Sequence, residues 1–190
     1  GTLVKGQRSG KGKLTMPDGL VFQGDWAEGQ INGNGILTQP NGDLYEGSFK
    51  DGLRDGQGKM THKNGDIYFG TWAKDQRQGQ GSFTTTDGFK YEGAWVTGKM
   101  EGTGSITYPD GSVYIGAMKA DQPNGQGAIT YPDGSTFQGN WVAGVISGEG
   151  RATYKDGRVY EGSFKQAKPD GKGLMTYPDG YRYEGDWVAG

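Results

Sequence analysis

The sequence predicts an all-β protein, built as an elongated, single-layer antiparallel meander of β-hairpin repeats. Three observations predict this fold class. A five-residue motif, for example Tyr91-Glu92-Gly93-Ala94-Trp95, recurs every 23 residues without insertion or deletion. A Gly-x-Gly pair and an Asp-Gly or Asn-Gly turn keep the same phase. Side chains around this motif alternate between two faces, which is typical of strands. A fixed period of this length indicates a repeat array.

The five-residue motif marks the first strand of each repeat. Its first position is aromatic in all eight copies, at Phe22, Tyr45, Tyr68, Tyr91, Tyr114, Phe137, Tyr160 and Tyr183. All five tryptophans share the fifth position, at Trp26, Trp72, Trp95, Trp141 and Trp187. In residues 44–50, Tyr45, Gly47 and Phe49 fall on one face of the predicted strand, and the residues between them fall on the other.

A second strand is expected over residues 56–62, followed by a turn at Lys63-Asn64-Gly65. Proline and glycine in such turns suit a type I turn with a bulge and a three-residue hairpin loop. This loop predicts that Met60 pairs with Tyr68 and Gly58 with Gly70. A four-residue link at 52–55 is expected to pair Phe49 with Gly58 and Gly47 with Met60.

Glycine recurs inside these strands although it costs about 0.5–1 kcal/mol there relative to alanine. Its return in every repeat therefore predicts a structural need, either room for an aromatic ring or a tight bend next to the neighbouring strand. The whole pattern predicts about 16 short strands.

The composition of the chain limits the classes of protein to which it can belong. Its 39 glycines among 190 residues resemble a disordered chain, but the strict period overrules that interpretation. A net charge of −2 provides no global basic field for nucleic acid or anionic lipid. The absence of cysteine excludes disulfides and thiolate metal sites. We find no signal peptide and no apolar run near the roughly 20 residues that a membrane helix needs.

We expect residues 1–190 to form a single array of about eight repeats, with no central core beyond the contacts between neighbours. Gly1 is in phase with Gly24, and Gly190 follows Trp187 by three residues. The array is therefore expected to be truncated from a longer one at both ends.

The motifs resemble those of MORN (membrane occupation and recognition nexus) repeats. Tyr183-Glu184-Gly185-Asp186-Trp187 and Tyr108-Pro109-Asp110-Gly111 are near-consensus copies, and the resemblance covers the whole chain. It implies hairpin repeats in a long grooved sheet, and a scaffold or partner-binding role rather than an enzyme. Family members have also been linked to phospholipid contact and to self-association through the ends of the array. The family's link is often basic with a histidine, whereas arginine occurs in these links only at Arg8, Arg54 and Arg77, which weakens the lipid implication.

No motif predicts catalysis, a cofactor or a metal. The Gly-x-Gly pairs lack the third glycine of a dinucleotide fingerprint and precede no expected helix. The carboxylates Glu46, Glu92, Glu161 and Glu184 are separated by whole hairpins, which is too far for an acid–base pair. The 23-residue period differs from the nonapeptide spacing of calcium-binding β-helices. His62 is the sole histidine, so a metal site or histidine triad is not expected.

The aromatic rows predict a groove that binds a partner segment, since large apolar patches usually mark interaction sites. The candidate residues are Tyr45, Tyr68, Trp72, Tyr91, Trp95, Tyr108, Tyr131, Trp141 and Tyr154. Internal packing of the repeat is the competing explanation for each ring. We therefore predict a non-catalytic scaffold that binds a protein partner or itself. The alternative is a wall or lipid-associated module that binds choline, glucan or phospholipid, although no glycine directly precedes a tryptophan as it does in cell-wall repeats.

Two residues break the polar pattern on the opposite face. The position after the first aromatic residue is Gln or Glu in six repeats, but it is Phe69 and Ile115 in the other two. Scattered apolar residues are common on surfaces. The competing hypothesis is that Phe69 and Ile115 mark an outer-face contact with a second copy or a partner.

Overall fold

The computed structural model describes all residues, 1–190, as seventeen β-strands without a helix. The chain divides into two units, Gly1–Gly98 and Lys99–Gly190. The first contains β1 (Thr2–Val4), β2 (Gln7–Thr15), β3 (Val21–Ala27), β4 (Gln30–Thr38), β5 (Leu44–Lys50), β6 (Leu53–Thr61), β7 (Ile67–Ala73), β8 (Gln76–Thr84) and β9 (Lys90–Val96). The second contains β10 (Lys99–Thr107), β11 (Val113–Lys119), β12 (Gln122–Thr130), β13 (Thr136–Val142), β14 (Val145–Thr153), β15 (Val159–Lys165), β16 (Lys168–Thr176) and β17 (Arg182–Trp187). The chain contains no helix with the length and apolar character of a membrane span.

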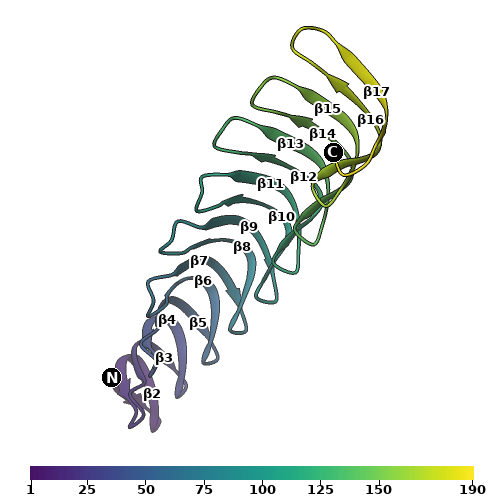
Figure 1. Cartoon of the computed structure of the whole chain (residues 1–190). Helices are drawn as coiled ribbons and strands as arrows, with labels where there is room; N and C mark the ends of the chain where they lie inside the picture. The colour runs from purple at the N-terminus through teal and green to yellow at the C-terminus, as the bar shows by residue number, and fades with distance from the viewer. The chain divides into compact units, whose positions relative to one another are not determined.

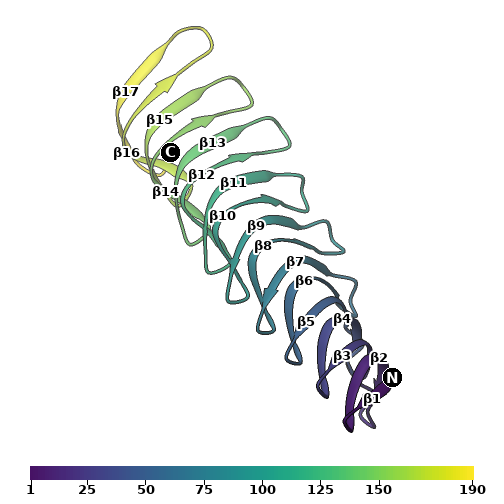
Figure 2. The same ribbon diagram turned by 180° about the vertical axis from the view of Figure 1, so that it is seen from behind.

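Within each unit the strands form an antiparallel meander, as the sequence predicts. In the first unit β1 to β9 pair in chain order, and in the second β10 to β17 do the same. Figure 1 shows this order, and the view from behind in Figure 2 shows that the strands curve along their length.

The three-residue loops have the predicted geometry. In one of them the Gly111 amide donates to the Tyr108 carbonyl at 2.9 Å, and the Tyr108 amide donates to the Ser112 carbonyl at 2.8 Å. Gly111 has a φ of +88°, which closes a type I turn with a glycine bulge. The register across such a loop is also confirmed, since Met60 pairs with Tyr68 in the equivalent hairpin.

The opposite end of the hairpin differs from the prediction. Lys50 pairs with Leu53, so the connection is the two-residue turn Asp51-Gly52 rather than a four-residue link. Asp51 and Gly52 have φ values of +50° and +81°, as a type I′ turn requires.

The predicted pairs beyond that link are therefore wrong. Gly47 pairs with Gly58 rather than with Met60, and Phe49 pairs with Arg54 rather than with Gly58. A register shift lies between Gly47 and Phe49.

The core of each unit is a ladder of aromatic rings that meet edge to face. Tyr45 contacts Phe49 in its own strand, with ring centroids 5.1 Å apart, and Trp72 of the next repeat at 5.3 Å. The second unit repeats the arrangement with Tyr160, Phe164 and Trp187. Such contacts stabilise the fold by about 0.5–1.5 kcal/mol each beyond the area they bury.

Strand glycines leave the space that these rings fill. A methyl group at Gly58 would overlap the ring of Tyr45, and one at Gly47 would meet the Gly58 backbone at 2.5 Å. The predicted need for room beside an aromatic ring is confirmed.

Hydrogen bonds from the two-residue turns to strands of the preceding repeat tie each repeat to the one before it. The Gly52 amide donates to the Ile31 carbonyl at 2.9 Å, and the Gly144 amide donates to the Pro123 carbonyl at 2.8 Å. Each hairpin is therefore held mainly by its neighbours, as repeat proteins generally are.

Candidate partner-binding surface

Most of the rings predicted to contact a partner lie inside the protein. Six of them are at most 5% exposed: Tyr45, Tyr68, Trp72, Tyr91, Trp95 and Trp141. The other three, Tyr108, Tyr131 and Tyr154, are partly exposed. The structure therefore separates one predicted set into core rings and surface rings.

The buried tyrosines use their hydroxyl groups internally. The hydroxyl of Tyr45 donates to the Ser48 carbonyl at 3.0 Å, and that of Tyr114 donates to the Ala117 carbonyl at 2.7 Å. Burial raises the pKa of Tyr45, Tyr68 and Tyr114 to about 12. These neutral groups bridge the register shift of their own strand.

The partly exposed tyrosines form a regular row in the second unit. This tyrosine row, defined as Tyr108, Tyr131, Tyr154 and Tyr177, directly follows β10, β12, β14 and β16. Burial raises the pKa of Tyr108, Tyr131 and Tyr154 above its ordinary value of about 10. These hydroxyls are protonated at neutral pH. The equivalent positions of the first unit hold Met16, Gln39, His62 and Thr85.

An aspartate accompanies each tyrosine of the row. This aspartate row comprises Asp110, Asp133, Asp156 and Asp179, and each carboxylate accepts the amide two residues later at 2.8–3.1 Å. The hydrogen bond from the Ser112 amide lowers the pKa of Asp110, and the hydrogen bond from the Ser135 side chain lowers that of Asp133. Both carboxylates are therefore ionised at neutral pH.

A cavity of about 530 Å³ joins the two rows. Tyr154, Lys155, Asp156 and Arg158 of one repeat line it, with Asp133 and Ser135 of the preceding repeat. The Arg158 guanidinium lies 5.1 Å from the centroid of the Tyr154 ring and 2.7 Å from the Asp156 carboxylate. The cavity offers an aromatic ring next to balanced charge, because the carboxylates of Asp133 and Asp156 accompany the cations of Lys155 and Arg158.

The first unit carries a different surface because arginines cover its rings. Arg54 lies 4.5 Å from the Trp72 ring centroid and 2.9 Å from the Asp75 carboxylate. Arg77 lies 4.9 Å from the Tyr68 ring centroid and 3.1 Å from His62 Nε2. The sole histidine is thus part of a side-chain network, and no three His, Cys, Asp or Glu side chains are grouped to hold a metal ion.

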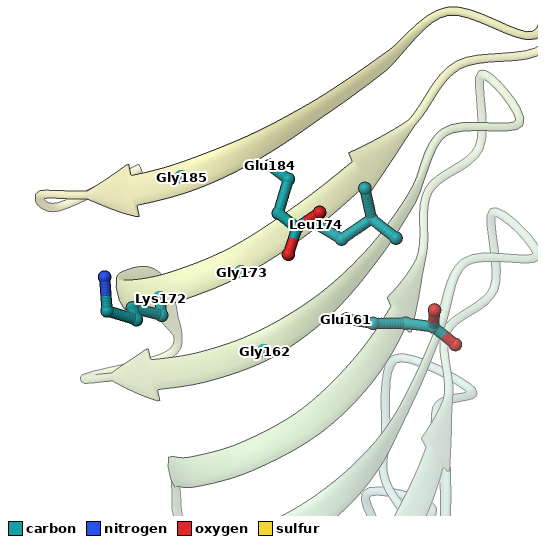
Figure 3. Close-up of a pocket in the computed structure, with 7 residues that line it drawn as sticks. All are labelled: Glu161, Gly162, Lys172, Gly173, Leu174, Glu184 and Gly185. Carbon is teal, nitrogen blue, oxygen red and sulfur yellow. The ribbon is translucent and has the colours of Figure 1, made fainter.

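Glycine backbone lines two shallow cavities that sequence reasoning missed. Figure 3 shows the one in the second unit, where Gly162, Gly173 and Gly185 lie side by side on β15, β16 and β17. Lys172 flanks these glycines on one side, and Glu184 lies on the other. The 23-residue glycine period was the available signal, because glycine pairs with glycine across every one of these strands.

The two apolar residues on the opposite face are exposed, as the alternation of the strands predicts. Phe69 is 56% exposed and lies between Lys59 and Ser82 of the adjacent strands. Ile115 is 63% exposed and lies between Ser105 and Ala128.

Comparison with protein families identifies repeats along the chain. A family model described as MORN repeat matches residues 1–21, 22–44, 45–67, 68–89, 91–113, 114–136, 137–157 and 160–180. No curated protein sequence matches the chain.

Two solved structures resemble this one. One is described as the SAS-4 (dCPAP) TCP domain of Drosophila melanogaster in complex with a proline-rich motif of Ana2 (dSTIL); the chains are 16% identical, with 93% of this chain and 90% of that chain covered and a TM-score of 0.50. The other is the TCP10 domain of Danio rerio CPAP, which is 18% identical over 92% of this chain and 83% of that chain, with a TM-score of 0.43. At these identities the first similarity concerns the fold alone.

Proposed function

Because the chain belongs to the MORN-repeat family, we propose that it is a non-catalytic scaffold that binds an extended segment of a protein partner. The tyrosine row carries this proposal. Its rings lie at the equivalent position of successive repeats and are partly exposed. Tyrosine is enriched at protein interfaces because it offers a large apolar ring and a polar hydroxyl.

The buried rings support the same proposal indirectly. Tyr114 and Tyr160 of the core are fully buried, and strands directly before the tyrosine row also carry buried residues such as Ile106 and Ile129. A surface backed by packed rings is preorganised, so a partner loses little affinity to rearrangement of this protein.

The structural similarity is compatible with this proposal. The Drosophila domain of similar fold is described in complex with a proline-rich motif. Open antiparallel sheets of this kind therefore include at least one that accommodates a short peptide from another protein.

The experiment is a selection from a random peptide library displayed on phage, using the intact chain. Wild-type protein should enrich peptides that the Tyr131→Thr/Tyr154→Thr variant does not retain. Threonine is a suited replacement because Thr85 occupies the equivalent position in the first unit. Unchanged circular dichroism and an unchanged urea midpoint would show that the variant is folded. Enrichment of the same peptides by both proteins would contradict a role for the tyrosine row, and no enrichment by wild type would contradict the proposed function.

A further inference from the structure

We infer that the tyrosine and aspartate rows of the second unit recognise a basic, proline-containing segment in the polyproline II conformation. This inference rests on the proposed function and names its partner class. Three features of the second unit lead to it: the spacing of the repeats, the state of the tyrosine hydroxyls and the sign of the neighbouring charges.

The spacing selects the conformation of the segment. Each repeat contributes two strands, and adjacent strands lie about 4.8 Å apart, so equivalent tyrosines recur roughly every 9.6 Å. A polyproline II helix rises about 3.1 Å per residue with three residues per turn, which is about 9.3 Å per turn. Residues i, i+3 and i+6 of such a segment therefore present the same face to Tyr108, Tyr131 and Tyr154.

Other conformations do not keep this register. An extended β-strand covers three residues in about 10 Å, but its side chains alternate, so successive tyrosines would meet opposite faces. An α-helix makes a turn in about 5.4 Å and completes a non-integral number of turns between two tyrosines.

The chemistry of the rings suits proline and its backbone. A tyrosine ring offers a flat apolar face to a pyrrolidine ring, as aromatic surfaces do in known polyproline recognition. In Tyr154 one of the two faces lies under the Arg158 guanidinium, which leaves the other face for the ligand. The hydroxyls of Tyr131 and Tyr154 are protonated at neutral pH, as tyrosine hydroxyls ordinarily are, and burial raises their pKa further. They can therefore donate hydrogen bonds to carbonyls of a polyproline II backbone, which makes none internally.

The aspartate row selects the charge of the segment. It follows the same 23-residue period as the tyrosines, so one carboxylate recurs for each three residues of the ligand. Asp156 is paired with Arg158 at 2.7 Å, and Lys155 lines the same cavity as Asp133. The four carboxylates of the row still outnumber these two cations, and hydrogen bonds lower the pKa of Asp110 and Asp133. A Lys or Arg at every third position would be complementary to this edge.

The first unit has no tyrosine in this row and keeps the aspartate only at Asp18 and Asp87, so it provides an internal control. Two of its loops have Asn41 and Asn64 in place of the aspartate, and each amide oxygen accepts the same backbone hydrogen bond at 3.0 Å. Substitution of Asp110 and Asp133 by asparagine therefore removes charge while it keeps the loop hydrogen bond.

The test uses the intact chain and a fluorescent peptide with four Pro-Pro-Lys triplets, with binding followed by anisotropy. Two peptides of equal length serve as probes of the inference, one with Ala-Ala-Lys triplets and one with Pro-Pro-Glu triplets. The Pro-Pro-Lys peptide should bind at least about tenfold more tightly than either, since loss of one interface hot spot has that magnitude.

Three variants locate the site. Tyr131→Thr/Tyr154→Thr should weaken binding about tenfold or more, and Asp110→Asn/Asp133→Asn should weaken it and reduce its dependence on salt. Gln39→Thr, at the tyrosine-row position of the first unit, should leave binding unchanged.

Three results would overturn the inference. Equal binding of the Ala-Ala-Lys and Pro-Pro-Lys peptides would mean that charge alone is recognised. Binding of the Pro-Pro-Lys peptide that is insensitive to the tyrosine variant would place it elsewhere. If the phage selection enriches tyrosine-dependent peptides without periodic proline, the proposed function stands and the polyproline inference fails.

Discussion

Gly58 shows why a single atom decides the packing of a whole repeat. Its missing side chain leaves the space that the Tyr45 ring occupies, and the same ring contacts Trp72 of the next repeat. The glycine period and the aromatic period are therefore one structural feature, in which each ring requires a position without a side chain beside it.

Replacement of Gly58 by alanine should destabilise the protein by about 1–3 kcal/mol, the usual cost of overpacking a core. Gly52→Ala is the matched control. Gly52, unlike Gly58, has a positive φ, but nothing lies within 4 Å of an added methyl group, and Ala167 already occupies the equivalent turn position at a φ of +62°. Urea unfolding of both variants checks this prediction. A smaller loss for Gly58→Ala than for Gly52→Ala would contradict the packing explanation.

Alkaline pH should destabilise the fold through its buried tyrosines. Burial raises the pKa of Tyr45, Tyr68 and Tyr114 to about 12, while the value in an unfolded chain is about 10. The unfolded state thus loses its protons first, so stability is unaffected below about pH 9 and falls as pH rises from about 10 to 12. Urea midpoints across this range, with tyrosinate absorbance, test the prediction.

The control for this effect also occurs in the chain. Phe22 and Phe137 take the same position as the buried tyrosines, so Tyr68→Phe should fold and should reduce the alkaline loss of stability. An identical alkaline loss in Tyr68→Phe would assign the effect to other groups.

At the scale of the hairpin, the two turns differ in how well sequence predicts them. The three-residue loop has proline, aspartate or asparagine, and glycine at fixed positions, and its register is confirmed by the pairing of Met60 with Tyr68. The two-residue turn has a weaker pattern. Its first residue varies, as at Asp51, Lys74 and Ala120, and its second is glycine in six turns but Asp75, Asp121 or Ala167 in the others. The recurring glycine is the signal for a type I′ turn that the four-residue prediction overlooked.

Sequence patterns alone do not predict the candidate surface. Alternation placed Tyr45 and Tyr108 among the aromatic rows, yet Tyr45 is fully buried and Tyr108 is partly exposed. Their difference arises because Tyr45 lies over glycines of its own hairpin, whereas Tyr108 lies at the end of its strand. A periodic sequence reports which residues are equivalent, but not how strongly a sheet curves over each row.

One turn residue also connects repeats. Asp75 takes the second turn position, where its carboxylate accepts the Arg54 amide at 2.9 Å and pairs with the Arg54 guanidinium at 2.9 Å. Asp75→Ala should therefore cost about 1.5–3 kcal/mol, the range for hydrogen bonds to a charged group. Asp51→Ala is the control, since Ala120 and Ala143 are found at its position. Equal urea midpoints for the two variants would show that the Asp75 contact contributes nothing.

At the scale of the whole molecule, a uniform fold carries a non-uniform surface. The repeats keep one period, but the side chains at their surfaces differ. In the first unit arginines lie over core rings, as Arg54 does over Trp72. The second unit carries the tyrosine row. Structural positions tolerate little variation because every repeat packs on its neighbours. Surface positions are free to differ between repeats, which allows one architecture to carry different surface chemistry in its two units.

The exposed apolar residues on the opposite face lead to a prediction about self-association. Phe69 and Ile115 are 56% and 63% exposed, at a position where other repeats carry Glu46, Glu92, Glu161 and Glu184. Phe69→Glu/Ile115→Glu should therefore fold normally, because glutamate already occupies this position elsewhere. If the outer face contacts a second copy, the double variant should sediment as a smaller species than wild type at equal concentration in analytical ultracentrifugation. Lys59→Gln, next to Phe69, controls for a change in charge. Unchanged sedimentation of the double variant, with unchanged peptide binding, would assign both residues to ordinary surface variation.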